Sequence, residues 1–186
     1  MSLCGTPPVV GILLAAGCGV RYGGPKALVK DWLADSVHVL SAGGCAEIIV
    51  VLGAASNQAR RLIPSGATIV IPTDWAEGMG ASLRAGLDAA QPTSAEAAVV
   101  HLVDLPGVGP EVVHRLVVVA GPSVLARVTY RGAPGHPVLL GREHWPGVVA
   151  TARGDLGARE YLRTREIDQI ECGDVAEGDD VDVRSR

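Results

Sequence analysis

One stretch near the N-terminus decides the expected fold: Val9-Val10-Gly11-Ile12-Leu13-Leu14-Ala15-Ala16, closed by Gly17. A short, continuous apolar run that ends at a glycine is typical of a strand buried on both faces, as in a parallel sheet covered by helices. Similar apolar runs follow at 48–52, 67–71 and 97–103, and later strand candidates lie at 124–130, 137–140 and 166–171.

Segments with helical spacing of apolar residues separate these runs. They lie at 36–42, 79–90 and 111–120, with weaker patterns at 55–63 and 156–163. Strands that alternate with helices of about ten residues predict a three-layer α/β fold with a doubly wound, mostly parallel sheet, similar to a Rossmann fold. We expect a single domain over residues 1–186, in which the polar, Asp-rich stretch 177–186 is a loose tail.

The composition limits the classes of function. Among the 186 residues, 48% are hydrophobic but only 3% are aromatic, and the net charge is −4. A nucleic-acid-binding protein normally carries a basic face. Because the net charge here is negative, we expect no nucleic-acid partner. No apolar run approaches the roughly 20 residues that span a bilayer, and no signal peptide is visible. The cysteines have neither disulfide nor zinc spacing, which is typical of reduced thiols. From these observations together we expect a cytoplasmic protein without a membrane partner.

Glycines are concentrated directly after the first strand, between Gly17 and Lys26. Their spacing fails the dinucleotide-binding fingerprint at Tyr22 and the P-loop pattern at Pro25. Glycines nevertheless let backbone N–H groups approach an anion closely, and Arg21 and Lys26 add two positive charges. The loop therefore predicts a polyphosphate site. The alternative is a glycine-rich turn with solvated basic residues.

Asp104 directly follows the apolar run at 97–103. In a parallel sheet it would lie at the same edge as the glycine loop, where ligands of such sheets bind. A carboxylate that faces a polyphosphate suits Mg²⁺, which binds one or two carboxylates together with phosphate oxygens. The alternative is a capping carboxylate before Pro106.

Five motifs together resemble one family. The stretch 14–28 resembles the signature L-A-A/G-G-x-G-x-R-x-G-x-x-K of the nucleotidyltransferase superfamily, and within it the molybdenum-cofactor nucleotidyltransferases are most similar. The similarity continues in family order through 74–83, 103–106, 135–139 and 154–159. The resemblance thus covers most of the chain and implies a Mg²⁺-dependent nucleotidyltransferase.

The resemblance also implies which residues form the site. It assigns nucleotide binding to Leu14, Ala15, Ala16, Gly17, Gly19, Arg21, Lys26, Gly80, Ser82 and Asp104. Of these, the catalytic residues are Arg21, Lys26 and Asp104. Acceptor binding is assigned to His136, Asp155 and Arg159.

A structural role is the alternative for several of these residues. Ser82 also fits a helix cap, His136 a structural histidine, and Asp155 with Arg159 a charge pair on a helix. The family has a second metal-binding carboxylate in a D-I-D-T-P-like segment, of which Asp180-Val181-Asp182 matches only D-x-D. Asp182 is therefore the second candidate ligand for Mg²⁺, and a solvated acidic tail is the alternative.

The resemblance implies transfer of CMP from CTP to the terminal phosphate of molybdopterin, with release of pyrophosphate and a molybdoenzyme as the later recipient. The preference for CTP rests on Leu14-Ala15-Ala16-Gly17, where a Leu-Ala-Gly-Gly run would indicate another base. Three alternatives remain: another phosphorylated acceptor such as a sugar phosphate, a non-catalytic cofactor carrier, and a redox enzyme, which the failed dinucleotide spacing disfavours. Because aromatic residues are scarce, we expect backbone and small side chains to surround the base.

Overall fold

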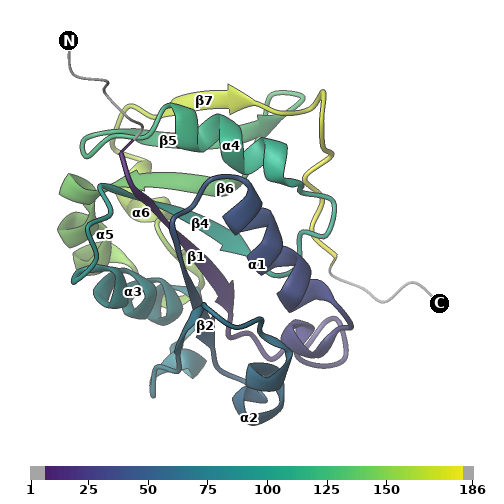
Figure 1. The fold of residues 1–186 in the computed structure, drawn as a ribbon. Coiled ribbons are helices and arrows are strands. Elements are labelled where there is room, and N and C mark those ends of the chain that lie inside the picture. Colours follow the sequence, from purple (N-terminus) through teal and green to yellow (C-terminus); the bar gives the residue numbers. More distant parts are fainter. Residues whose placement is uncertain (1–6, 182–186) are drawn as a thin grey trace.

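Seven strands form a single sheet in the computed structural model, which describes residues 7–181 (Figure 1). The strand order is β3-β2-β1-β4-β6-β5-β7. All pairings are parallel except the two that β6 makes, with β4 and with β5. The strands are β1 (Val9–Ala15), β2 (Glu47–Leu52), β3 (Thr68–Val70), β4 (Ala97–Leu102), β5 (Leu125–Tyr130), β6 (Ala133–Gly141) and β7 (Asp168–Glu171).

Helices cover both faces of the sheet, so the predicted three-layer, mostly parallel α/β fold is confirmed. One core lies beneath α1 (Trp32–Ala42) and α4 (Pro110–Val118), and the other beneath α3 (Met79–Ala90), α5 (Trp145–Thr151) and α6 (Arg159–Leu162). No helix within residues 7–181 is long and apolar enough to cross a membrane. The short elements are α2 (Ser56–Ala59), η1 (Lys26–Leu28), η2 (Arg60–Leu62), η3 (Trp75–Glu77), η4 (Arg142–His144) and η5 (Gly154–Leu156).

The apolar run that predicts the first strand is buried over its whole length as β1. Its side chains alternate between the two cores, with Leu13 beneath α1 and Ile12 beneath α3. Helix α3 lies close on this strand because Gly86 has no side chain: a Cβ there would lie 2.6 Å from Cγ2 of Ile12. Strand β1 is therefore the centre on which both helical layers pack.

The structure differs from the sequence prediction in the second half of the chain. Helix α5 was not predicted, and the helix expected at 156–163 is divided into η5 and α6. The break lies at Gly157, whose φ of +54° is incompatible with a continuous helix. Strand β6 extends beyond the predicted 137–140 and runs antiparallel to its neighbours.

The segment after β7 is bound to the rest of the fold as far as the structure describes it. Arg115 of α4 forms two hydrogen bonds of 2.7 Å with the carboxylate of Asp174. Within the stretch expected to be loose, Glu177 lies 3.3 Å from a guanidinium nitrogen of Arg131, and the N–H of Val181 donates to the carbonyl of Asp104 at 3.0 Å. This segment therefore returns to the end of β4.

Substituting Trp145 should show how strongly the unpredicted helix α5 is held. Its ring is fully buried, its indole N–H donates to the carbonyl of Leu140 at 2.9 Å, and the guanidinium of Arg142 lies 4.9 Å from the ring centre. We expect Trp145→Ala to lower the free energy of unfolding by about 3–5 kcal/mol, measured by urea denaturation. Val119→Ala, at a partly exposed position, should change it by less than about 0.5 kcal/mol. Equal effects of the two substitutions would contradict this packing.

Acid should weaken the attachment of the final segment through Glu171. Hydrogen bonds from the Thr129 hydroxyl and from the N–H groups of Gly173, Gly132 and Arg131 lower the pKa of Glu171 to about 2, from an ordinary value of 4.5. Because the folded state favours the ionised form, this stabilisation is present above pH 4.5 and is lost as the pH falls toward 2. The difference in unfolding free energy between wild type and Glu171→Gln should therefore shrink over that range. A difference independent of pH would refute this linkage.

Candidate active site

A cavity of about 430 Å³ lies at the carboxyl edge of β1 and β4. The two strands are parallel neighbours, with Leu14 beside Leu102, so the loops that follow them emerge at the same edge. This first cavity brings together residues of both loops and of α3. The predicted nucleotide-binding residues that line it are Leu14, Ala15, Ala16, Gly17, Gly19, Lys26, Ser82 and Asp104.

The glycine loop closes on itself around Gly19. The carbonyl of Gly19 accepts hydrogen bonds from the N–H groups of Gly23 at 2.9 Å and of Gly24 at 3.1 Å. Gly19 has a φ of +60°, and a Cβ there would overlap the carbonyl oxygen of Gly24. The loop therefore requires glycine at this position. Element η1 follows at once and carries Lys26 back toward the end of β4.

Lys26 and Asp104 form an ion pair at the base of the first cavity. Nζ of Lys26 lies 2.7 Å from Oδ2 of Asp104, and both side chains are more than four-fifths buried. The other carboxylate oxygen, Oδ1 of Asp104, is buried and has no hydrogen-bond partner among residues 7–181. An unsatisfied buried oxygen of this kind is costly, and a carboxylate oxygen beside a cavity is a good ligand for a divalent cation. The site thus fits a metal ion at Asp104.

The second metal ligand expected from the sequence, Asp182, lies outside the described residues. Its neighbour Val181 donates a backbone hydrogen bond to Asp104, so the described chain ends beside the first carboxylate. Within residues 7–181, there is no group of three or more His, Cys, Asp or Glu side chains that could hold a metal ion. A cation at Asp104 would therefore need oxygens from a substrate, from water or from beyond residue 181.

The N-terminus of α3 also faces the first cavity, through Gly78, Met79 and Ser82. The helix has no side-chain cap and no acidic residue in its first turn, so its N–H groups can attract an anion. The residue that caps this helix is Gly78, and no side chain caps the helix, so Ser82 is not a capping residue. The Ser82 side chain is buried and lines the first cavity. Gly80 does not line the cavity; a Cβ there would lie 2.7 Å from the backbone nitrogen of Arg153, so this glycine lets α3 pack closely.

Two features of the first cavity differ from the expectation. Trp75, on η3, lines it, so an aromatic ring is present as well as backbone and small side chains. The ring packs over Gly53, where a Cβ would lie 2.7 Å from it. Arg21 is exposed on the glycine loop and is not among the residues that line the cavity. Trp75 belongs to the 74–83 motif, which was the available signal for it.

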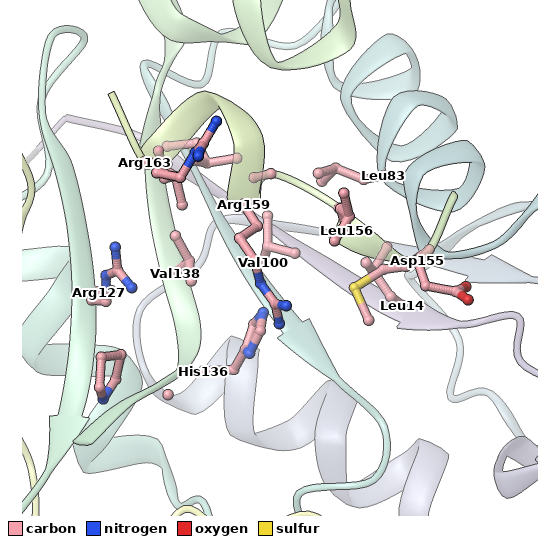
Figure 2. Close-up of a pocket in the computed structure, with 17 residues that line it drawn as sticks. Leu14, Leu83, Val100, Arg127, His136, Val138, Asp155, Leu156, Arg159 and Arg163 are labelled. Carbon is pink, nitrogen blue, oxygen red and sulfur yellow. The ribbon is translucent and has the colours of Figure 1, made fainter. Parts of the chain in front are cut away.

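A second cavity of about 410 Å³ adjoins the first (Figure 2). The two share Leu14, Met79 and Asp155, which form the boundary between them. All three residues predicted to bind an acceptor line the second cavity: His136, Asp155 and Arg159. Arg127 of β5 and Arg163, just after α6, also line it and were not predicted.

The structure places His136 among charged groups. The Tyr130 hydroxyl donates to its carbonyl at 2.8 Å, and in Figure 2 its ring lies beside the side chain of Arg159. Burial lowers the pKa of His136; the negative charge of Asp104 opposes this, and the positive charges of Arg159 and Arg127 add to it. The pKa of His136 is thus lowered, which favours the neutral imidazole. The alternative role for Asp155 and Arg159 was a charge pair on a helix. Among residues 7–181, these two side chains form no ion pair with each other.

Enlarging Gly78 should disturb both cavities at their boundary. Gly78 has a φ of +118°, and a Cβ there would lie 2.5 Å from Oδ1 of Asp155 and 2.7 Å from the carbonyl of Gly154. We expect Gly78→Ala to destabilise the fold by about 1–3 kcal/mol and to weaken nucleotide binding, measured by thermal unfolding and by calorimetric titration with nucleoside triphosphates. Gly107→Ala is the control, because a Cβ at Gly107 would meet nothing within 4 Å. Equal nucleotide binding by the two variants would argue against this boundary.

Comparison with known proteins agrees with this geometry. The MobA-like NTP transferase domain matches residues 11–170. The chain is 39% identical over 192 residues to the nicotine blue oxidoreductase of Paenarthrobacter nicotinovorans, covering 95% of this chain and 93% of that protein.

Two solved structures of Rv0371c from Mycobacterium tuberculosis H37Rv are also similar. One has 27% identity and a TM-score of 0.81, covering 96% of this chain and 95% of that chain. The other, in complex with manganese, has 26% identity and a TM-score of 0.74, covering 89% and 88% of the two chains. From the extent of the domain match and the identity to its relatives, the chain belongs to the MobA-like NTP transferase family.

Proposed function

We propose that the protein transfers a nucleotidyl group from a nucleoside triphosphate to a phosphorylated acceptor and releases pyrophosphate. The observation that carries the proposal is the Lys26–Asp104 pair beneath the glycine loop, beside a second cavity lined by arginines. The first cavity offers backbone N–H groups, a lysine and a carboxylate that would hold a metal ion beside a polyphosphate. The second offers positive charge for the acceptor's phosphate.

The reaction requires one bond to form and one to break. An oxygen of the acceptor's terminal phosphate attacks the α-phosphorus, and the bond from that phosphorus to the β-phosphate oxygen breaks to release pyrophosphate. The attacking phosphate is already anionic, so no general base is needed. Lys26 would stabilise negative charge near the α-phosphate, while Arg21 and the loop N–H groups would hold the β- and γ-phosphates. Phosphoryl-type chemistry depends mainly on such positioning and charge neutralisation.

A divalent cation, which we propose is Mg²⁺, completes this site. Asp104 would hold it through Oδ1, with Asp182 as the proposed second carboxylate. The cation would neutralise charge on the phosphate oxygens. The manganese complex of the related Rv0371c supports a divalent metal in this family.

We further propose that the nucleotide is CTP and that the acceptor is molybdopterin, with a molybdoenzyme as the later recipient. The sequence resemblance at Leu14-Ala15-Ala16-Gly17 supports CTP, and this run lines the first cavity. The apolar wall of the second cavity, which includes Leu83, Val100 and Leu140, suits a ring system better than the hydroxyl groups of a sugar phosphate. A non-catalytic carrier would bind the same ligands without releasing pyrophosphate.

The 39% identity to a protein named nicotine blue oxidoreductase favours a second candidate function, a redox reaction. In that case, a reduced nicotinamide nucleotide in the first cavity would transfer a hydride, two electrons and one proton, to a planar dye in the second. To test this candidate, the oxidation of NADH or NADPH is monitored by absorbance, with nicotine blue as the hydride acceptor. Turnover without release of pyrophosphate would favour it over nucleotidyl transfer.

The direct test of the transferase is to incubate the purified protein with each nucleoside triphosphate, Mg²⁺ and molybdopterin. We expect pyrophosphate release that is fastest with CTP. If none of the nucleoside triphosphates yields pyrophosphate, the transferase proposal is excluded.

Removing Lys26 should slow transfer strongly while the protein remains folded. We expect Lys26→Ala to lower the rate of pyrophosphate release by about 10²–10³-fold, because it removes the positive charge near the reacting phosphate. Lys30→Ala is the matched control: Lys30 is 92% exposed and lies 3.8 Å from Asp31 at the surface. Circular dichroism should show that both variants fold. A Lys26→Ala rate equal to that of Lys30→Ala would remove Lys26 from the mechanism.

A further inference from the structure

Strand β5 is buried at every residue except Arg127, which is half-buried. Ala126 and Val128 point into the core beneath α1 and α4, whereas Leu125 belongs to the core on the opposite face. Side chains alternate along a strand, so Arg127 points to the same face as Leu125. It is paired in register with buried Val138 of β6, and it lines the second cavity (Figure 2). The arginine thus occupies a position where the fold would accept an apolar residue.

Neither Arg127 nor Arg159 has a partner of opposite charge in the described part of the chain. No hydrogen bond or ion pair within residues 7–181 involves either guanidinium group. Asp155 is the one carboxylate among the described residues that line this cavity, and it pairs with neither arginine. Arg163, in contrast, lies 3.3 Å from a carboxylate oxygen of Glu160. Arg127 is half-buried, whereas Arg159 is exposed at the rim of the cavity. A half-buried positive charge without a counter-ion is costly, and an anion bound at Arg127 would offset that cost.

His136 connects these arginines with the first cavity. The charges of Arg159, Arg127 and Asp104 all act on its ring, so the ring lies within electrostatic reach of each group. His136, Arg127 and Arg159 line the same cavity, which meets the first cavity at Leu14, Met79 and Asp155. An acceptor phosphate held by the arginines would therefore lie in the cavity that adjoins the proposed nucleotide site.

We propose that Arg127 is a specificity-determining residue that binds, together with Arg159, the attacking phosphate monoester of the acceptor. The inference rests on the proposed nucleotidyl transfer and adds a residue that no motif indicates. Arginine suits this role because its planar group can donate two parallel hydrogen bonds to a phosphate. The apolar wall of Leu83, Val100 and Leu140 would contact the remainder of the acceptor, so affinity should require both a ring and a phosphate.

The test measures binding in the full-length protein without nucleotide or metal. The probe is 1-naphthyl phosphate, a planar apolar ring with a phosphate monoester, and 1-naphthol is the same ring without the charge. Calorimetric titration should show saturable binding of the phosphate by wild type. Arg127→Gln should weaken it at least about tenfold, as expected for loss of hydrogen bonds to a charged group, and Arg127→Lys less so. Binding of 1-naphthol should be weak and unaffected by either substitution.

The matched control is Arg61→Gln, which removes an exposed arginine on η2 that lines neither cavity. It should bind 1-naphthyl phosphate as wild type does, and thermal unfolding should show that all variants are folded. No saturable binding by wild type, or equal binding by Arg127→Gln and Arg61→Gln, would overturn the inference.

The kinetic readout separates this inference from the proposed function. If transfer occurs, Arg127→Gln should raise KM for the acceptor at least about tenfold and leave KM for CTP unchanged. Pyrophosphate release with an unchanged acceptor KM would refute the role of Arg127 while supporting the transferase. Arg127-dependent binding of the probe without pyrophosphate release from any nucleotide would refute the transferase while supporting the phosphate site.

Discussion

The ion pair between Nζ of Lys26 and Oδ2 of Asp104 joins the two loops on which the site depends. One loop follows β1 and the other follows β4, and the parallel pairing of these central strands places both at the same edge. The pair fixes one carboxylate oxygen of Asp104, and within the described part of the chain Oδ1 has no partner beside the first cavity. The backbone of the same residue accepts a hydrogen bond from Val181, so the glycine loop, the central strand and the end of the described chain converge at Asp104.

The reversal of β6 explains why a second cavity lies beside this centre. Because β6 runs antiparallel between β4 and β5, it begins at the edge where β4 ends and brings His136 there. Strand β5 adds Arg127 from beyond β6, and α6 adds Arg159 from the helical layer. The N-terminal half of the chain thus forms most of the first cavity and the C-terminal half most of the second. Such a division suits an enzyme that binds two substrates side by side.

Much of the fold and of the first cavity could be predicted from the sequence, because short-range patterns encode them. Continuous apolar runs mark β1, β2 and β4, and the glycine loop and Asp104 follow two of these runs. The direction of β6 has no such pattern, since a strand reads alike in either direction. Helix α5 has only seven residues and depends on the burial of Trp145. Arg127 resembles any strand arginine until the tertiary structure shows which core it faces.

The chain belongs to an NTP transferase family and is also similar to a protein named for redox activity. The role of Asp104 distinguishes the two chemistries, because only nucleotidyl transfer is proposed to use a metal ion there. The most direct measurement is Mn²⁺ binding, followed by electron paramagnetic resonance, in the presence of a non-hydrolysable CTP analogue. The account predicts nucleotide-dependent binding by wild type and binding at least about tenfold weaker in Asp104→Asn, because the substitution removes the carboxylate ligand. Equal Mn²⁺ binding by wild type and Asp104→Asn would contradict it.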